Sequence, residues 1–190
     1  MKKLLAIIVL SLCLITPSQG DDITDFQIEG MSLYESALNY FSEEKIKKSI
    51  RKNSYPNSDG KFYDAQLVLN SFETYKDVQV VFMKNDKKYM IYAISGGLFF
   101  DNMAQCLTKQ KKIDKDLKKI FTNANRREGK KRLHEADKTK RSWVKQVNYY
   151  FRTGTIDLVC YDWNDDFSKD KYILVSIDSP EFDEWLQTAN

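Results

Sequence analysis

A change of hydrophobic period in the middle of the chain constrains its fold more than any other feature. From Asp101 to Ala124, apolar residues recur at helical spacing among lysines, which predicts one amphipathic helix. Strand-like runs rich in aromatic and β-branched residues stand on both sides of this helix. They are Phe62–Leu69, Val78–Met83 and Tyr89–Ile94 before it, and Trp143–Phe151, Ile156–Trp163 and Tyr172–Ile177 after it.

Turn residues separate these runs. Asn85 and Asp86 predict a hairpin between the second and third runs, and Thr153-Gly154 predicts another within the later group. Gly96-Gly97 predicts the end of the third run. The segment Asn123–Arg141 is polar, and we expect it to be a connector.

Helices are also predicted near both ends of the mature chain. Ser32 and Glu35 have the spacing of a capping box, and Ser42 offers a second N-cap, so we expect two short helices or one bent helix there. At the C-terminus, Ser179 is a predicted N-cap and Pro180 suits the first helical position. Phe182, Trp185 and Leu186 would then face inward.

The order of elements is therefore α-βββ-α-βββ-α, which includes a possible internal repeat of a helix followed by three strands. Strands grouped between helices with short connections are typical of the α+β class. We predict an antiparallel sheet of about six strands with helices packed mainly on one face.

The N-terminus predicts export. Lys2 and Lys3 precede an apolar run from Leu4 to Ile15, and small residues follow, so residues 1–20 have the pattern of a signal peptide cleaved after Gly20. Cys13 follows Leu12 rather than a small residue, which argues against lipidation. No later apolar run is long enough to span a membrane, so we expect a periplasmic or secreted protein that is not an integral membrane protein.

Two cysteines, Cys106 and Cys160, remain after the predicted cleavage. In an oxidising compartment they predict a structural disulfide, with two buried free thiols as the alternative. Hydrophobic residues make up 42% of the chain, ample for one core. Because the disulfide would tie the halves together, we expect residues 21–190 to form a single α+β domain.

The distribution of charge gives one candidate binding segment. The net charge of +3 falls to +1 without Lys2 and Lys3, so no global charge argument for nucleic acid remains. Between residues 126 and 141, however, eight bases stand against three acids, a pattern that could bind an anionic lipid, polymer or protein surface. These bases are Arg126, Arg127, Lys130, Lys131, Arg132, Lys138, Lys140 and Arg141. The alternative is a solvated linker.

The sequence does not identify a catalytic site, a metal site or a cofactor. Its single histidine, His134, lies in the most polar segment and is interpreted as a solvated loop residue, which leaves no base for a nucleophilic triad. The same count excludes zinc sites that need several His or Cys ligands, and no phosphate-binding glycine loop is present. Carboxylates could act as general acid and base, but they are too numerous for a pair to be chosen.

The stretch "CYDWNDDFSKD", residues 160–170, has acidic and polar residues at every second position, as calcium-binding EF-hand loops do. Counted from Asp162, the required glycine at position 6 is Phe167, and the bidentate glutamate at position 12 is Ile173. We therefore interpret this stretch as an acidic connector between two strands.

Three stretches carry a resemblance to known proteins: "DFQIEGMSLYESALNYFSEEKIKK", "YMIYAISGG" and "CYDW". In them, the chain resembles a family of small exported proteins from oceanic bacteria, which implies export and carries no activity. The segment from "GMSLYESAL" to Ile94 is also similar to modules of β-lactamase-inhibitor proteins and of small outer-membrane assembly lipoproteins. That likeness implies a helix pair followed by three strands.

Two function classes follow from these observations. The first is a noncatalytic binding or interaction module outside the cytoplasm, with an anionic partner on the basic segment. The alternative is a small hydrolase-like enzyme that uses carboxylate chemistry. A concave pocket lined by convergent polar groups with shifted pKa values would keep the enzyme hypothesis open, and a flat sheet face would remove it.

Overall fold

A computed structural model describes residues 23, 26–51, 54–55, 58–164 and 170–188. The predicted signal peptide, its cleavage point and residues 165–169 of the acidic connector lie outside the described residues. The first half of the fold contains a short 3-10 helix η2 (Ala37–Asn39), the helix α1 (Glu43–Ser49) and the strands β1 (Phe62–Leu67), β2 (Val78–Met83) and β3 (Ala93–Phe100). We call this half the first unit.

The second unit begins with the long helix of the sequence prediction, α2 (Met103–Ile120), which the Asn102 side chain caps by accepting from the backbone N–H of Gln105. Its strands are β4 (Asn125–Glu128), β5 (Arg132–Leu133), β6 (Trp143–Phe151), β7 (Gly154–Asp162) and β8 (Lys171–Asp178). The helix α3 (Pro180–Thr188) follows, and Ser179 caps it as expected.

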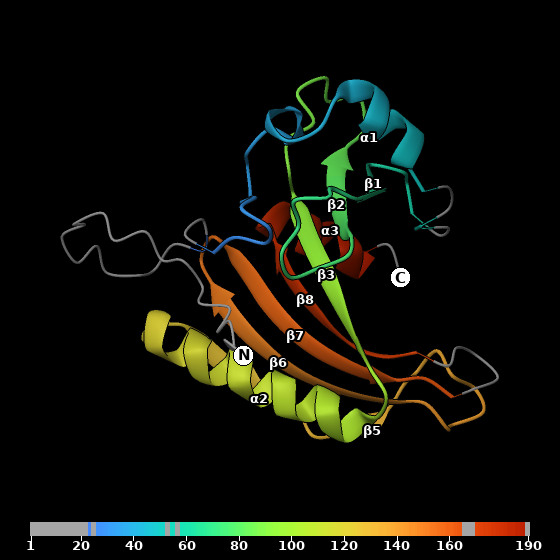
Figure 1. Ribbon diagram of the computed structural model, residues 1–190, viewed down its shortest axis with the longest axis vertical. Helices are drawn as coiled ribbons and strands as arrows, with labels where there is room; N and C mark the ends of the chain where they lie inside the picture. The colour runs from blue at the N-terminus through green and yellow to red at the C-terminus, as the bar shows by residue number, and fades with distance from the viewer. Residues whose placement is uncertain (1–22, 24–25, 52–53, 56–57, 165–169, 189–190) are drawn as a thin grey trace, which may run out of the picture.

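All these strands form one antiparallel sheet in the order β1-β2-β3-β8-β7-β6-β4, with β5 also paired to β6 (Figure 1). The α+β class and the antiparallel sheet are therefore as predicted, and each unit supplies a helix followed by three principal strands. The units meet where β3 pairs with β8 over eight residue pairs.

The predicted strand count was too low, because the sheet has eight strands in the described part of the chain. The two additional strands, β4 and β5, lie in the segment that we expected to be a connector. Arg126 explains why so polar a segment joins the sheet: its guanidinium donates to Asp114 of α2 at 2.6 and 2.9 Å, which anchors β4 beside β6.

The predicted end of the third strand at Gly96-Gly97 was also wrong. β3 starts later than expected and continues through both glycines to Phe100. Gly96 is required in mid-strand because the Tyr75 ring lies over it, and a Cβ atom there would come within 2.5 Å of the ring. The preceding residues, Tyr89 and Ile91, instead accept hydrogen bonds from Ala37 and Tyr34.

These same hydrogen bonds shorten the first predicted helix. Ser32 and Glu35 do form a capping contact of 3.2 Å, but Tyr34 has a positive φ of 63° and its N–H donates to Ile91. The backbone therefore leaves the helical conformation, and only the turn η2 forms before α1. The Ser42 cap of α1 is present as predicted.

The helices cover both faces of the sheet. Ile46 of α1 and Cys106 and Leu117 of α2 belong to the main hydrophobic core on one face. On the opposite face, Phe182 and Trp185 of α3 pack with Phe62, Val81 and Ala93 in a smaller cluster. Figure 1 shows α3 behind the strands and α2 in front of them. The expectation of helices mainly on one face thus holds for α1 and α2 but not for α3.

Cys106 and Cys160 are joined by a disulfide, which ties α2 to β7. Both cysteines belong to the second unit, so the bond does not connect the halves as expected; the β3–β8 pairing does. Among the helices of the described ranges, none has the length and apolar character that a membrane span requires.

Candidate ligand-binding site

A row of polar side chains crosses the face of the sheet that α2 does not cover. Strand register places one polar residue of each of seven strands opposite the next, from β1 to β4. The row is Gln66, Gln79, Ser95, Ser176, Asp157, Asn148 and Arg127. We call it the cross-sheet polar row. The row lies on the face opposite the main core, where an antiparallel sheet commonly carries polar residues, so it becomes a candidate site only through the cavity that lies over it.

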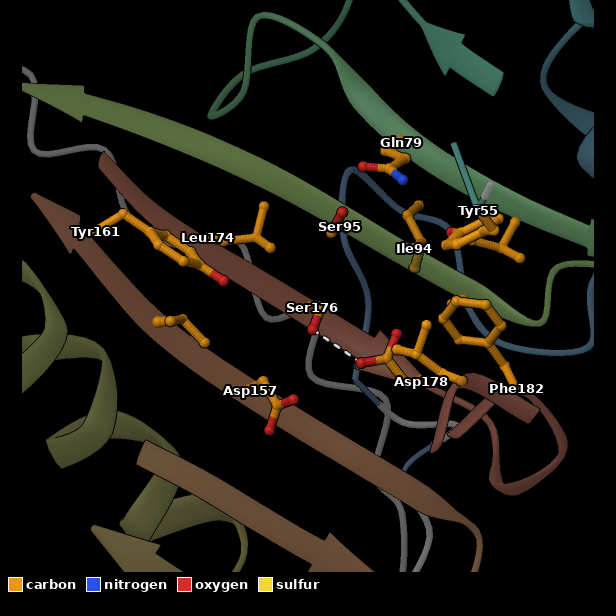
Figure 2. Close-up of a pocket in the computed structure, with 14 residues that line it drawn as sticks. Tyr55, Gln79, Ile94, Ser95, Asp157, Tyr161, Leu174, Ser176, Asp178 and Phe182 are labelled. Carbon is orange, nitrogen blue, oxygen red and sulfur yellow. Dashed lines mark hydrogen bonds between the residues drawn. The ribbon is translucent and has the colours of Figure 1, made fainter. Parts of the chain in front are cut away.

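A cavity of about 240 Å³ lies over the middle of this row. Its floor is formed by β2, β3, β8 and β7, and α3 closes one end with Phe182 and Leu186. Figure 2 shows Gln79, Ser95, Ser176 and Asp157 on successive strands, with Tyr55 and Phe182 at one end and Tyr161 at the other.

Two carboxyl groups, those of Asp157 and Asp178, line the cavity. Burial raises the pKa of Asp157 to about 6, and the negative charge of Asp183 adds to this rise. The hydrogen bond from Asn148 acts in the opposite direction and lowers the pKa. Burial also raises the pKa of Asp178 well above its ordinary value, and the charges of Asp157 and Asp183 add to this effect. Carboxyl groups with raised pKa values in a concave site are typical of functional sites.

A third carboxyl group stands beside the cavity. Asp183 of α3 accepts a hydrogen bond from the Thr155 hydroxyl at 2.7 Å, and burial raises its pKa as well. The hydrogen-bond partners of all three carboxyls are neutral: Asn148, Ser176 and Thr155. In the described residues, the side-chain hydrogen bonds that these three carboxyls accept therefore come from neutral groups.

Basic side chains are absent from the described lining of the cavity, which contains no Lys, Arg or His. Two guanidinium groups act on its tyrosines from outside the lining: Arg51 near Tyr55 and Arg132 near Tyr161. Each of these arginines is paired with a carboxylate elsewhere, Arg51 with Asp64 and Arg132 with Glu135. The cavity is consequently an electronegative site.

Ser95 contributes a hydroxyl group to the cavity. Ser95 is only 8% exposed and lines the cavity, and no hydrogen bond within the described ranges of the chain uses its Oγ atom. A hydroxyl group is both donor and acceptor. A hydroxyl group that lines a cavity can exchange hydrogen bonds with a ligand there.

Aromatic rings continue the site beyond Tyr161. Ring centroids are 5.0 Å apart between Tyr161 and Tyr172, 5.7 Å between Tyr161 and Trp163, and 5.5 Å between Tyr172 and Phe99. Phe99 is 60% exposed. Exposed aromatic groups next to convergent polar groups are characteristic of small-molecule sites.

His134 lies in a loop, as interpreted from the sequence, but its side chain is half-buried rather than solvated. Its ring packs against Trp163 at 4.3 Å between centroids, and burial lowers its pKa. Its backbone N–H donates to Ser142, which fixes the loop to the start of β6. The histidine therefore supports the aromatic group of the site.

The eight bases of the predicted anion-binding segment do not share one surface. Arg126 points toward α2 and pairs with Asp114 and Glu128, whereas Arg127 lies on the other face over the Tyr150 ring. Lys131 lies over Trp143, and Arg132 pairs with Glu135. The remaining bases, Lys130, Lys138, Lys140 and Arg141, are exposed.

Anion binding by this segment stays a prediction, and its exposed lysines are the residues to test. Charge reversal of Lys130, Lys138 and Lys140 leaves the Arg126 anchor intact. Loss of retention on anionic lipid or polymer would support the hypothesis, and unchanged retention would refute it.

The acidic connector shows structural roles in its described part. Asp162 lies 3.7 Å from Lys171 of the paired strand, and the Asn164 N–H donates to the Ser142 hydroxyl. Within the described ranges, no group of three or more His, Cys, Asp or Glu side chains is placed to hold a metal ion.

Sequence analysis did not identify the residues of the cavity. Asp157 and Asp178 were hidden among many acids, and Ser95 lay beside the glycines that we expected to end a strand. One pattern could have indicated Asp157: it is the only charged residue within the run "TIDLVC", and aspartate is depleted in strands.

Comparisons with family models, with curated proteins and with solved structures find no match for this chain. The candidate site therefore rests on the geometry of the cavity and on the chemistry of its side chains.

Proposed function

We propose that the protein is a noncatalytic binding module that acts outside the cytoplasm, and that the cavity over the cross-sheet polar row is its binding site. The observation that carries this proposal is the convergence of Ser95, Ser176 and Asp157 from three adjacent strands into one cavity. Rigid strands hold these groups in fixed positions, as a binding site requires. The disulfide supports the oxidising location.

Nuclear magnetic resonance titration of the labelled protein tests this proposal. Small amines, saccharides, carboxylates and phosphates are added separately, up to millimolar concentration. We expect saturable shifts centred on the amides of Gln79, Ser95 and Ser176. If no class of ligand shifts these amides, or if the shifts are confined to the α2 face, the proposal is wrong.

A cavity-filling variant provides the matched control for this titration. Ser95→Leu places a larger side chain in the cavity and should abolish the shifts, whereas Thr108→Leu on the exposed surface of α2 should leave them unchanged. Thermal unfolding of both variants distinguishes loss of binding from loss of the fold.

The raised carboxyl pKa values favour one second function, a hydrolase-like enzyme. A carboxyl group with a pKa of about 6, as in Asp157, can both donate and accept a proton near neutral pH. Chromogenic esters, glycosides and phosphates test this alternative. Turnover that Asp157→Asn abolishes and Asp116→Asn preserves would support catalysis, and the absence of turnover on all three substrate classes would refute it.

A further inference from the structure

We propose that the cavity binds the ammonium group of a small organic amine between Asp157 and Asp178. This inference rests on the proposed function, because it assigns a ligand class to the same site. Two carboxyl groups with neutral hydrogen-bond partners, the Ser95 hydroxyl group and aromatic side chains meet in this one cavity.

The first argument is charge. Asp157 and Asp178 interact unfavourably with each other and with Asp183, and each accepts its hydrogen bond from a neutral group. An ammonium group has three donors and a positive charge. Placed between the two carboxylates, it would form charge-assisted hydrogen bonds and relieve the repulsion between them. An anionic ligand would increase that repulsion.

The second argument is the composition of the walls. Tyr55, Phe182 and Tyr161 line the cavity and present aromatic surface to its occupant. Aromatic faces attract organic cations, most strongly where water is excluded. The carbon chain of an amine would contact these rings and Leu174, while the Ser95 Oγ atom could accept one ammonium N–H.

The size of the cavity limits the ligand. Its volume of about 240 Å³ lies below the usual range for drug-sized ligands, so it suits a molecule of roughly ten non-hydrogen atoms or fewer. Putrescine, a four-carbon diamine, is a suitable probe. Butane-1,4-diol and succinate have the same carbon chain length but are neutral and anionic.

Calorimetric titration with these three probes at pH 7.5 tests the inference on the purified protein. We expect putrescine to bind, and the diol and succinate not to bind. Asp157→Asn and Asp178→Asn should each weaken putrescine binding at least about tenfold, because a charge-assisted hydrogen bond becomes neutral. Asp116→Asn, on the outer surface of α2, makes the same change of charge and should have no effect.

The pH dependence of binding is a second measurement on the same variants. Asp157 faces Asp178 of β8, Asp183 of α3, and Asn148 and Tyr161 of its own side of the sheet, none of which is cationic. Protonation of Asp157 as the pH falls from 7.5 to 5 should therefore weaken putrescine binding. Asp157→Asn should reduce this dependence.

The outcomes separate the two proposals. If the diol or a saccharide binds in the cavity and putrescine does not, the amine inference is wrong and the binding module stands. If putrescine binding falls equally in Asp116→Asn, the attraction is a general surface effect and the inference is wrong. If no ligand of any class reaches the cavity, both proposals fail.

Discussion

At the scale of the residue, Gly96 determines the path of β3 because it has no side chain. Gly96 and Gly97 are adjacent in β3 and therefore face opposite sides of the sheet. The Tyr75 ring occupies the space beside Gly96, whereas a Cβ atom on Gly97 would meet only Phe99, at 3.8 Å. A side chain therefore has no room at Gly96, whereas a small one has room at Gly97.

Substitution of these glycines measures that difference. Gly96→Ala should lower the free energy of unfolding by about 1–3 kcal/mol, because the Tyr75 ring must move out of a packed core. Gly97→Ala has room for its methyl group and should change stability by less than about 0.5 kcal/mol. Urea unfolding followed by tryptophan fluorescence measures both, and equal losses would contradict the packing argument.

At the scale of the element, β4 is held by ionic contacts rather than by hydrophobic burial, and the most buried of them joins Arg126 to Asp114. Three of its residues are exposed, and only Arg126 turns inward, where Asp114 accepts from its guanidinium and from the Tyr149 hydroxyl. Burial tends to raise the pKa of Asp114, but the hydrogen bonds from Arg126 and Tyr149 prevail and lower it to about 2. The ion pair between Arg126 and Asp114 therefore holds β4, at the edge of the sheet, against α2.

Replacement of Arg126 tests how much this ion pair stabilises the protein. Arg126→Met leaves the Asp114 charge partly uncompensated and should cost about 3 kcal/mol of stability. Arg127→Met changes the next residue, which is exposed and lies over the Tyr150 ring, and should cost less than about 1 kcal/mol. Urea unfolding gives the energies, and faster hydrogen exchange in β4 would locate the loss. Similar losses in the two variants would refute a specific role for Arg126.

Elements with a strong hydrophobic period could be predicted from the sequence. The helix α2, the strands β2 and β6, and the Ser179-capped α3 follow from local pattern and capping chemistry. Elements decided by distant partners could not: β4 needs Asp114, and the path of β3 needs Tyr75. The candidate site belongs to the second kind, because the cross-sheet polar row depends on the register of seven strands.

At the scale of the whole molecule, the two faces of the sheet respond to pH in opposite directions. On the α2 face, the pKa of Asp114 is about 2, so its contribution to stability is present at neutral pH and is lost as the pH falls below 4. On the cavity face, the pKa values of Asp157, Asp178 and Asp183 are raised. The folded protein binds those protons more tightly than the unfolded chain, and stability rises as they bind.

A mildly acidic optimum of stability follows. Asp157 has a folded pKa of about 6 against an ordinary value of 3.8, so the free energy of unfolding should increase as the pH falls from 7.5 to 5. Thermal or urea unfolding at a series of pH values measures this trend. Asp157→Asn should flatten it, whereas Asp116→Asn should not. The same pH trend in the wild type and in Asp157→Asn would contradict the raised pKa of Asp157.

The position of β8 also has a consequence for the order in which the sheet can be completed. β8 is synthesised after the other seven strands of this sheet, yet it is the central strand that lies between β3 and β7. Until residues 171–178 arrive, both of those strands present an unpaired edge, which is a template for association with other chains. Chains that end before β8 should therefore aggregate or exchange strands, and a synthetic peptide of residues 170–188 should rescue them by filling the gap between the two units.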